Sequence, residues 1–254
     1  MNIAIVTGAS SGMGKEFVLQ LPGAVAVDEI WAIARRGGEL EKLRGVSAVP
    51  VRPIVLDLCR EESFATYAAL LEAQKPNVRL LVNAAGFGKF GTYSRIDTED
   101  ECRMIDLNCK ALLMMTRLTV PYMAPGSHIL ELDSLSAFQP VPYITTYGAT
   151  KAFVLSYSRA MNRELKDKGI RVMAMNPGWV KTEFFNRAAE KKHVPAYKKM
   201  VMADPKKVVK KAWRDNLMDR ELSVYGKPMQ LFYLGTKIIP HRFILHFMGR
   251  KKGA

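Results

Sequence analysis

The chain begins with a strand, a glycine-rich turn and a helix, and this order limits the folds that it can adopt. Residues 2–7 read NIAIVT, a β-branched run typical of a buried strand. Glycines follow at positions 8, 12 and 14, and the apolar residues then recur with helical spacing from about Met13 to Leu21. Such a turn presents backbone N–H groups and a helix N-terminus to a phosphate. The glycine pattern is weak by itself, and the flanking strand and helix strengthen it.

The alternation continues along the chain. Strands are expected at 29–34, 53–58, 79–82, 129–132 and 170–175, and helices at 61–74, about 98–118 and from about Tyr147. Alternating strands and helices predict a parallel, doubly wound α/β sheet with right-handed crossovers. Ligands of such sheets bind beyond the carboxyl ends of the strands. The residues that fall at these ends are Gly8, Arg35, Asp57, Asn83, Ser134 and Pro177.

Past residue 180 the pattern changes. Residues 181–204 are expected to form a loop-rich or short-helical cap, and 205–218 an amphipathic helix with proline in its first turn. Residues 222–225 read as a last strand, and 228–247 as an apolar segment interrupted at Pro240. No linker divides the chain, so a single domain over residues 1–254 is expected.

Tyr147 and Lys151 lie four residues apart, so they share one face of the helix that opens near Tyr147. A phenol has a pKa of about 10, and a neighbouring ammonium is expected to lower that pKa toward a useful value. Ser134, beside the helix start, would donate a hydrogen bond to the same substrate oxygen. The pattern predicts a site that moves a proton on and off an alcohol or carbonyl. Tyrosine and lysine at this spacing also occur as ordinary surface pairs.

Two arginines, Arg35 and Arg36, directly follow the second expected strand. In a dinucleotide-binding βαβ unit, the residue at this place meets the adenosine ribose. An acidic residue would bind the free 2′-hydroxyl of NAD, whereas arginine suits the 2′-phosphate of NADP. NADP(H) is therefore favoured over NAD(H). The alternative is a solvated arginine pair at a helix start.

The positive charge is concentrated near the C-terminus. Residues 187–254 carry 17 Lys/Arg and 5 Asp/Glu, which is +12 of the chain's net +14. A solvated face, with helices that pack on the sheet or on a second subunit, is the favoured explanation. Contact with an anionic membrane surface is the main alternative, because Phe243, Leu245, Phe247 and Met248 lie among basic residues. Nucleic acid is not expected as a partner, since no nucleic-acid-binding fold accompanies the charge.

Cysteine and histidine usage predicts neither disulfides nor a catalytic metal. Cys59, Cys102 and Cys109 form no C-x-x-C pair and are interpreted as reduced core thiols, the last two on one buried helix face. The four histidines have no metal-ligand spacing. The chain shows neither a signal-peptide pattern nor an apolar run of about 18 residues. A cytoplasmic location is expected.

Several motifs, in order and at matching spacing, resemble the short-chain dehydrogenase/reductase family over roughly residues 2–185. The 13 positions from Ser134 to Tyr147 are part of this match. The resemblance implies a Rossmann-type sheet of about seven strands in the order 3-2-1-4-5-6-7, with helices on both faces. Beyond the matching part, the residues over about 186–254 are expected to form a helical, basic C-terminal extension. The motifs are Thr7-Gly8-Ala9-Ser10-Ser11-Gly12-Met13-Gly14, Asp57, Asn83-Ala84-Ala85-Gly86, Asn108, Ser134, Tyr147-x-x-x-Lys151, and Pro177-Gly178 with Thr182.

The resemblance also implies a role for each motif residue. Tyr147 would be the general acid in reduction and the base in oxidation, and Lys151 would lower its pKa and hold the nicotinamide ribose. Ser134 would polarise the substrate oxygen, and Asn108 would keep a water that connects Lys151 to solvent. Hydride would pass between the nicotinamide and the substrate carbon. The implied cofactor contacts are Gly8, Ser10, Ser11, Gly12, Met13, Gly14, Arg35, Arg36, Asp57, Leu58, Asn83, Ala84, Ala85, Gly86, Tyr147, Lys151, Pro177, Gly178, Val180 and Thr182.

Two positions depart from the family pattern. Ala84 stands where a second asparagine is usual, which we interpret as a tolerated structural change. Ser11 stands where some NADP-preferring members have a basic residue, so the prediction of NADP rests on Arg35 and Arg36.

The loops that supply substrate contacts in this family are aromatic here and carry little charge, which predicts a hydrophobic ketone or secondary alcohol as substrate. A steroid-like ring system, a 3-oxoacyl group and a xenobiotic ketone all remain open. A homodimer or homotetramer is expected. The alternative is a non-catalytic NADPH-binding regulator on the same fold. The candidate substrate contacts are Phe87, Phe138, Tyr143, Trp179 and Phe184, with Phe90, Val141 and Phe185 beside them.

Overall fold

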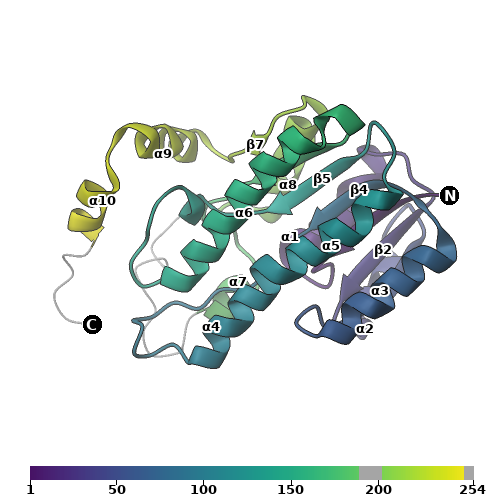
Figure 1. Ribbon diagram of the computed structural model, residues 1–254, viewed down its shortest axis with the longest axis horizontal. Helices are drawn as coiled ribbons and strands as arrows, with labels where there is room; N and C mark the ends of the chain where they lie inside the picture. The colour runs from purple at the N-terminus through teal and green to yellow at the C-terminus, as the bar shows by residue number, and fades with distance from the viewer. Residues whose placement is uncertain (189–201, 249–254) are drawn as a thin grey trace.

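A computed structural model describes residues 1–188 and 202–248 and contains one seven-stranded, all-parallel sheet (Figure 1). The strand order is β3-β2-β1-β4-β5-β6-β7, which confirms the predicted topology. Successive parallel strands need crossover connections, and helices provide them here. The strands are β1 Asn2–Thr7, β2 Glu29–Ala34, β3 Val51–Val55, β4 Asn77–Asn83, β5 His128–Leu132, β6 Arg171–Met175 and β7 Leu222–Ser223.

Helices cover both faces of the sheet because its central strands are apolar on both sides. Along β1, Ala4 and Val6 pack in one core with α1 (Gly12–Gln20), α2 (Gly37–Arg44) and α8 (Pro205–Leu217). Ile3 and Ile5 point to the other core, which α3 (Glu61–Gln74), α5 (Leu112–Thr119) and α6 (Thr145–Glu164) cover. The alternation of side chains along each strand therefore produces the doubly wound architecture.

Two expected elements differ from those observed. The strand expected at 53–58 lies at Val51–Val55, so Asp57 falls in the turn beyond it. Pro53 is accommodated because β3 is an edge strand. The helix expected over 98–118 consists of α4 (Thr98–Ile105), a π-helical turn (Asp106–Ala111) and α5.

The interpretation of Cys102 as a core thiol is wrong, because its side chain is exposed while Cys109 is half-buried. Seven residues of regular α-helix would place both thiols on nearly one face. The intervening π-helical turn has more residues per turn and rotates one thiol away from the other.

The last two helices of the described chain extend away from the sheet (Figure 1). After the short α7 (Phe184–Ala188) and α8, the chain forms β7 and then α9 (Lys227–Ile238) and α10 (His241–Met248), with the break at Pro240 as expected. Most of the cap expected at 181–204 lies outside the described residues. No helix in the described ranges is long and apolar enough to cross a membrane.

Candidate active site

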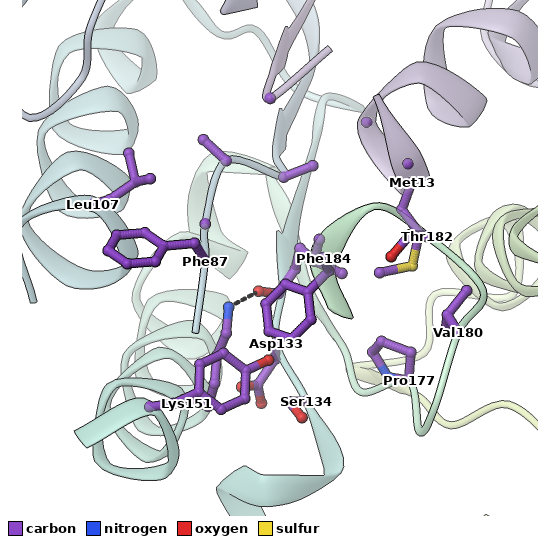
Figure 2. Close-up of a pocket in the computed structure, with 18 of the residues that line it drawn as sticks. Met13, Phe87, Leu107, Asp133, Ser134, Lys151, Pro177, Val180, Thr182 and Phe184 are labelled. Atoms are coloured by element: carbon purple, nitrogen blue, oxygen red, sulfur yellow. Dashed lines mark hydrogen bonds between the residues drawn. The ribbon is translucent and has the colours of Figure 1, made fainter. Parts of the chain in front are cut away.

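A cavity of about 500 Å³ opens at the carboxyl ends of the strands, where the sequence predicts a ligand (Figure 2). The glycine turn after β1 and the segment after β6 form one side, and the loop after β5 with the start of α6 forms the floor. The cavity therefore gathers residues from most of the predicted motifs. Predicted residues that line it are Gly8, Ser10, Ser11, Gly12, Met13, Gly14, Arg35, Arg36, Asp57, Leu58, Ala84, Ala85, Gly86, Phe87, Ser134, Tyr147, Lys151, Pro177, Gly178, Trp179, Val180, Thr182 and Phe184.

The glycine turn is shaped so that only glycine fits at its key positions. Gly8 has φ +66° and Gly12 φ +53°, a backbone conformation that side chains strongly disfavour. A Cβ on Gly14 would lie 2.3 Å from the Gly8 carbonyl oxygen, and one on Gly8 would lie 2.8 Å from the Ala84 oxygen. The turn thus packs tightly against the end of β4 and brings the N-terminus of α1 to the cavity.

Thr7 ties the two central strand ends together. Its Oγ1 accepts hydrogen bonds from the backbone N–H groups of Ala84 (3.0 Å) and Ala85 (3.1 Å). Thr7 also pairs with Asn83 in the register of the two strands. These bonds hold the glycine turn and the segment 83–86 at a fixed separation beneath the cavity.

Arg35 and Arg36 lie at the rim of the cavity with their guanidinium groups partly exposed. Arg36 Nη1 donates to Glu183 at 3.0 Å, and its Nε donates to Ser10 Oγ at 3.3 Å. Arg35 lies 3.9 Å from the Asp57 carboxylate. The arginine pair is therefore more than a solvated helix start: it connects the end of β2 with the glycine turn and with the segment after β6.

Ser134 and Lys151 lie on the floor of the cavity (Figure 2). Tyr147 lines the cavity with them. Tyr147 lies in the first turn of α6 and Lys151 one turn further, with its Nζ 5.8 Å from the centre of the Tyr147 ring. Lys151 is only 4% exposed and donates to the Leu132 carbonyl oxygen at 2.6 Å. Ser134 begins the 3-10 turn after β5 and lies close enough to Tyr147 to influence its pKa.

The expected effect of Lys151 on Tyr147 is not observed. Burial raises the pKa of Tyr147, and the nearby Asp133 raises it further, while the Ser134 hydroxyl acts in the opposite direction. Burial also lowers the pKa of Lys151, against the attraction of Asp133. The sequence argument counted the ammonium charge but not the loss of water around the phenol, which has the larger effect here.

Asn108 lies in the π-helical turn, directly behind the cavity wall. Its Oδ1 accepts from the Phe87 N–H at 3.1 Å, and its Nδ2 donates to the Phe87 oxygen at 2.9 Å and to Thr150 Oγ1 at 3.0 Å. A Cβ on Gly86 would lie 2.9 Å from Asn108 Oδ1 and 3.8 Å from Lys151 Nζ. Asn108 thus joins the loop after β4 to the helix that carries Tyr147 and Lys151.

Two buried carboxyl groups on β5 and just beyond it were not singled out from the sequence. Glu131 is fully buried, accepts from Asn83 Nδ2 at 3.2 Å and Thr116 Oγ1 at 3.0 Å, and burial raises its pKa to about 8. Asp133 lines the cavity beside Ser134 and accepts a hydrogen bond from Asn176. Burial raises the pKa of Asp133 well above its usual range. The sequence signal that could have revealed these carboxyl groups is the presence of acidic residues in and directly after an apolar strand.

The remaining wall of the cavity is aromatic. Phe184 packs 5.5 Å from the Tyr147 ring, and Phe90 lies 6.3 Å from Trp179 between ring centres. Phe138 and Tyr143 do not line the cavity; Phe138 packs against Tyr233 of α9 at 4.5 Å. Sequence reasoning missed Met229 and Phe232, which α9 contributes to the cavity rim. No group of acidic, histidine and cysteine side chains in the described ranges could hold a metal ion.

Comparisons with known proteins agree with this architecture. The family model of short chain dehydrogenases matches residues 2–193. The chain belongs to this family. It is therefore an oxidoreductase, and its relatives are named accordingly.

Two curated short chain dehydrogenase relatives and one solved structure illustrate the similarity. An uncharacterized oxidoreductase of Staphylococcus epidermidis is 29% identical over 71% of this chain and 78% of its own length. An NADP-dependent 3-hydroxy acid dehydrogenase of Escherichia coli K12 is 30% identical over 83% of this chain and 87% of its own length. The structure of a short-chain dehydrogenase from Sphingobium yanoikuyae in complex with NADPH is 25% identical, with a TM-score of 0.79 over 100% of this chain and 99% of that one.

Proposed function

We propose that this protein is an NADP(H)-dependent oxidoreductase that interconverts a hydrophobic ketone and a secondary alcohol. The observation that carries the proposal is the position of Ser134, Tyr147 and Lys151 on the floor of one cavity. The glycine turn bounds this cavity on one side and an aromatic wall bounds it on the other. The full chain would act as one domain, with residues 186–254 as a basic extension over the site and a second copy or more completing a homo-oligomer.

The residues around the cavity fit a dinucleotide. Gly8 and Gly14 let the turn pack directly on the backbone around it, and a Cβ on Gly12 would meet only the Thr182 side chain, at 3.4 Å, so a pyrophosphate can approach the turn and the N-terminus of α1. Asp57 and Leu58 would lie beside the adenine, and Asn83, Ala84, Ala85 and Gly86 would support the central part of the cofactor. Pro177, Gly178, Val180 and Thr182 would border the nicotinamide, which supplies or accepts the hydride when bound.

Arg35 and Arg36 support NADP(H) over NAD(H). Their partly exposed guanidinium groups lie at the cavity rim beyond β2, where a 2′-phosphate would form charge-assisted hydrogen bonds. The relative in Escherichia coli is named NADP-dependent, and the Sphingobium structure contains NADPH. The contact between Arg36 and Glu183 would rearrange when the phosphate binds, because the phosphate competes for the same guanidinium.

Tyr147 would exchange the proton. In reduction its hydroxyl donates to the carbonyl oxygen while Ser134 donates a second hydrogen bond to that oxygen. A raised pKa keeps Tyr147 protonated near neutral pH, which is the form needed for reduction. Lys151 would place its ammonium beside the phenolate that remains and would hold the nicotinamide ribose. Asn108, through its bonds to Phe87 and Thr150, would hold a water that returns a proton to Lys151.

The aromatic wall supports a substrate with a large apolar body. Phe87, Trp179 and Phe184 line the cavity near the proposed reaction centre, where Lys151 and Asp133 also lie. An apolar wall excludes water from the reacting atoms and stabilises the substrate by burial of its hydrocarbon surface.

The proposal is tested by cofactor binding and turnover measured in parallel. NADPH and NADH titrations are followed by a panel of hydrophobic ketones, for the wild type, Tyr147→Phe and Tyr143→Phe. We expect Tyr147→Phe to lower turnover by about 10²–10⁴-fold with NADPH binding unchanged. Tyr143 lies outside the cavity lining, so Tyr143→Phe serves as the matched control and should retain activity.

A second arm of this experiment examines cofactor choice. The double variant Arg35→Ala/Arg36→Ala should weaken NADPH binding by about tenfold or more and leave NADH binding nearly unchanged. Arg44 is exposed, pairs with Glu41 and lies at the other end of α2 from Arg36, so it provides the control Arg44→Ala. Wild-type preference for NADH would contradict the role of the arginines. Tight NADPH binding without reduction of any ketone would contradict the enzymatic proposal and favour a regulator.

A further inference from the structure

The helices α9 and α10 form a C-terminal arm, residues 227–248, that projects from the sheet (Figure 1). The arm differs from the other helices in its packing. No residue of α9 is buried, although Leu, Ile, Phe, Tyr and Met make up much of the helix. An apolar helix in water normally buries its apolar stripe against a neighbour.

Helix α9 has two opposite apolar faces, and the protein covers only one. Met229 and Phe232 line the cavity rim, and Tyr233 packs on Phe138. With 3.6 residues per turn, Leu231, Leu234 and Ile238 lie on the opposite side of the helix. Their exposed fractions are 71%, 56% and 82%. The outer face is therefore a continuous apolar stripe that faces solvent.

The apolar surface continues past the break at Pro240. Ile239 is 47% exposed, and Phe243 and Leu245 of α10 are 48% and 37% exposed. Seven of the large hydrophobic side chains exposed in the described ranges thus fall within 15 residues, from Leu231 to Leu245. Concentrated apolar exposure of this kind marks an interaction surface.

The charge of the segment indicates the partner. Glu221 is the last acidic residue of the chain, so residues 222–254 contain six Lys/Arg and no Asp/Glu. Lys227, Lys237 and Arg242 lie on the arm beside the apolar stripe and are exposed. Apolar side chains next to cations without acidic residues complement a bilayer whose headgroups are anionic and whose interior is hydrocarbon.

We propose that the C-terminal arm docks on an anionic phospholipid bilayer, with the outer face of α9 and the apolar residues of α10 in the headgroup region. A second copy of the chain is the other occupant to consider. A symmetric contact between two arms would bring two sets of like charges together, which opposes association. A bilayer removes the same apolar surface from water and neutralises the charge.

Docking would also place the cavity beside the bilayer. The inner face of α9 forms part of the cavity rim through Met229 and Phe232, so the membrane-facing and cavity-facing sides belong to one helix. A substrate dissolved in the bilayer would then reach the aromatic wall without crossing bulk water. The docking itself does not depend on catalysis and is measured without turnover.

The test is cosedimentation of the full chain with vesicles. One set of vesicles contains phosphatidylcholine with about 30% phosphatidylserine, and the other contains phosphatidylcholine alone. We expect binding to the anionic set only, weakened by salt. Leu231→Ser/Leu234→Ser/Ile238→Ser and Lys227→Glu/Lys237→Glu/Arg242→Glu should each reduce the partition constant by about tenfold or more. Circular dichroism and thermal unfolding verify that each variant is folded.

A matched control separates the arm from the overall charge of the protein. Lys206→Glu/Lys207→Glu/Lys210→Glu makes the same change in net charge on α8, where all three lysines are exposed. This variant should bind vesicles like the wild type, and an equal loss of binding would overturn the assignment to the arm. Absence of wild-type binding to anionic vesicles would also overturn it. So would a fall in the solution mass of the serine triple variant, because the stripe would then be a contact between copies.

Discussion

The floor of the cavity and the C-terminal arm border the same space, yet they are built in opposite ways. Lys151 of the floor is 4% exposed and donates to the Leu132 carbonyl oxygen, and Glu131 of the adjoining strand β5 is fully buried and accepts from Asn83 of β4. On the arm, Leu231 and Ile238 are 71% and 82% exposed. Proton transfer needs groups whose positions are fixed within a few tenths of an ångström. A cavity rim that admits varied apolar molecules does not need side chains held so precisely. The difference predicts that substitutions on the floor alter the rate of the chemical step, whereas substitutions on the arm alter the affinity for substrate.

The largest expected effect concerns the pH dependence that burial imposes on the floor. Oxidation of an alcohol needs the Tyr147 phenolate, and burial raises the pKa of this phenol. Below that pKa the phenolate fraction grows about tenfold per pH unit, so oxidation should accelerate by up to about a thousandfold from about pH 6 to 9. Reduction uses the protonated phenol and should not accelerate. Single-turnover rates in both directions measure this, and an oxidation rate independent of pH would contradict it.

The next effect concerns the tight packing of the glycine turn beside the floor. Gly14→Ala places a methyl group 2.3 Å from the Gly8 carbonyl oxygen, so the glycine turn must move. We expect a loss of about 1–3 kcal/mol in the free energy of unfolding, together with weaker NADPH binding. Gly38→Ala is the control, because nothing lies within 4 Å of its added Cβ. Denaturant unfolding and NADPH titration of both variants give the comparison, and equal effects would show that the turn is not constrained.

A further effect, on the pH dependence of stability, comes from the buried acid of β5. The pKa of Glu131 is raised from 4.5 to about 8, so the folded protein keeps a proton there that the unfolded chain releases. The stability contributed by this proton is fully present below pH 4.5 and is lost as the pH rises through about 8. Glu131→Gln cannot titrate, so it should lose less stability than the wild type across this window.

Thermal midpoints at acidic and mildly alkaline pH measure the effect of Glu131→Gln. The exposed Glu62 supplies the control Glu62→Gln, which should follow the wild type at each pH. A variant whose midpoint falls with pH as steeply as that of the wild type would mean that Glu131 is already ionised in the folded protein.

The smallest effect is expected on the arm. Phe232 lines the cavity rim but lies away from the reacting atoms, so Phe232→Ala should raise KM by about 3–10-fold and leave kcat nearly unchanged. Leu234 faces the outer side of the same helix at 56% exposure, and Leu234→Ala should change neither constant in the absence of membrane. Steady-state kinetics with one hydrophobic ketone distinguish the two variants. A fall in kcat for Phe232→Ala would show that the arm takes part in positioning the reacting groups.

Patterns in the sequence were sufficient for the parallel α/β sheet and the place of the cavity because both depend on local regularities, whereas the strand order came from the family resemblance. Apolar strands alternating with helices allow few right-handed arrangements, and the carboxyl ends of parallel strands meet at one edge. Ser134, Tyr147 and Lys151 therefore come together as their spacing predicts. The role of each of these residues stays a prediction until the experiments above are made.

The direction of the pKa shift of Tyr147 did not follow from the spacing of the site residues in the sequence. The sequence places an ammonium near the phenol of Tyr147 and suggests a lowered pKa, whereas the pKa is raised because the phenol loses its water and lies near Asp133. Burial of this phenol depends on the segments after β4, β5 and β6, which place Gly88, Ser134 and Phe184 beside Tyr147. That arrangement joins residues far apart in the chain and has no signature in a local pattern.

By itself the sequence determined the fold class, the glycine turn and the identity of the motif residues, since these depend on periodicity and on backbone geometry, and its resemblance to the family implied the strand order. Only the tertiary structure decided that Asn108 lies in a π-helical turn, that Phe138 packs under α9 while Met229 and Phe232 form the cavity rim, and that the outer stripe of α9 is uncovered. The physical reason is that the exposure of a side chain depends on which other elements of the folded protein pack against it. A helix pattern shows which side chains share a face, but only the packed molecule shows which face has a partner.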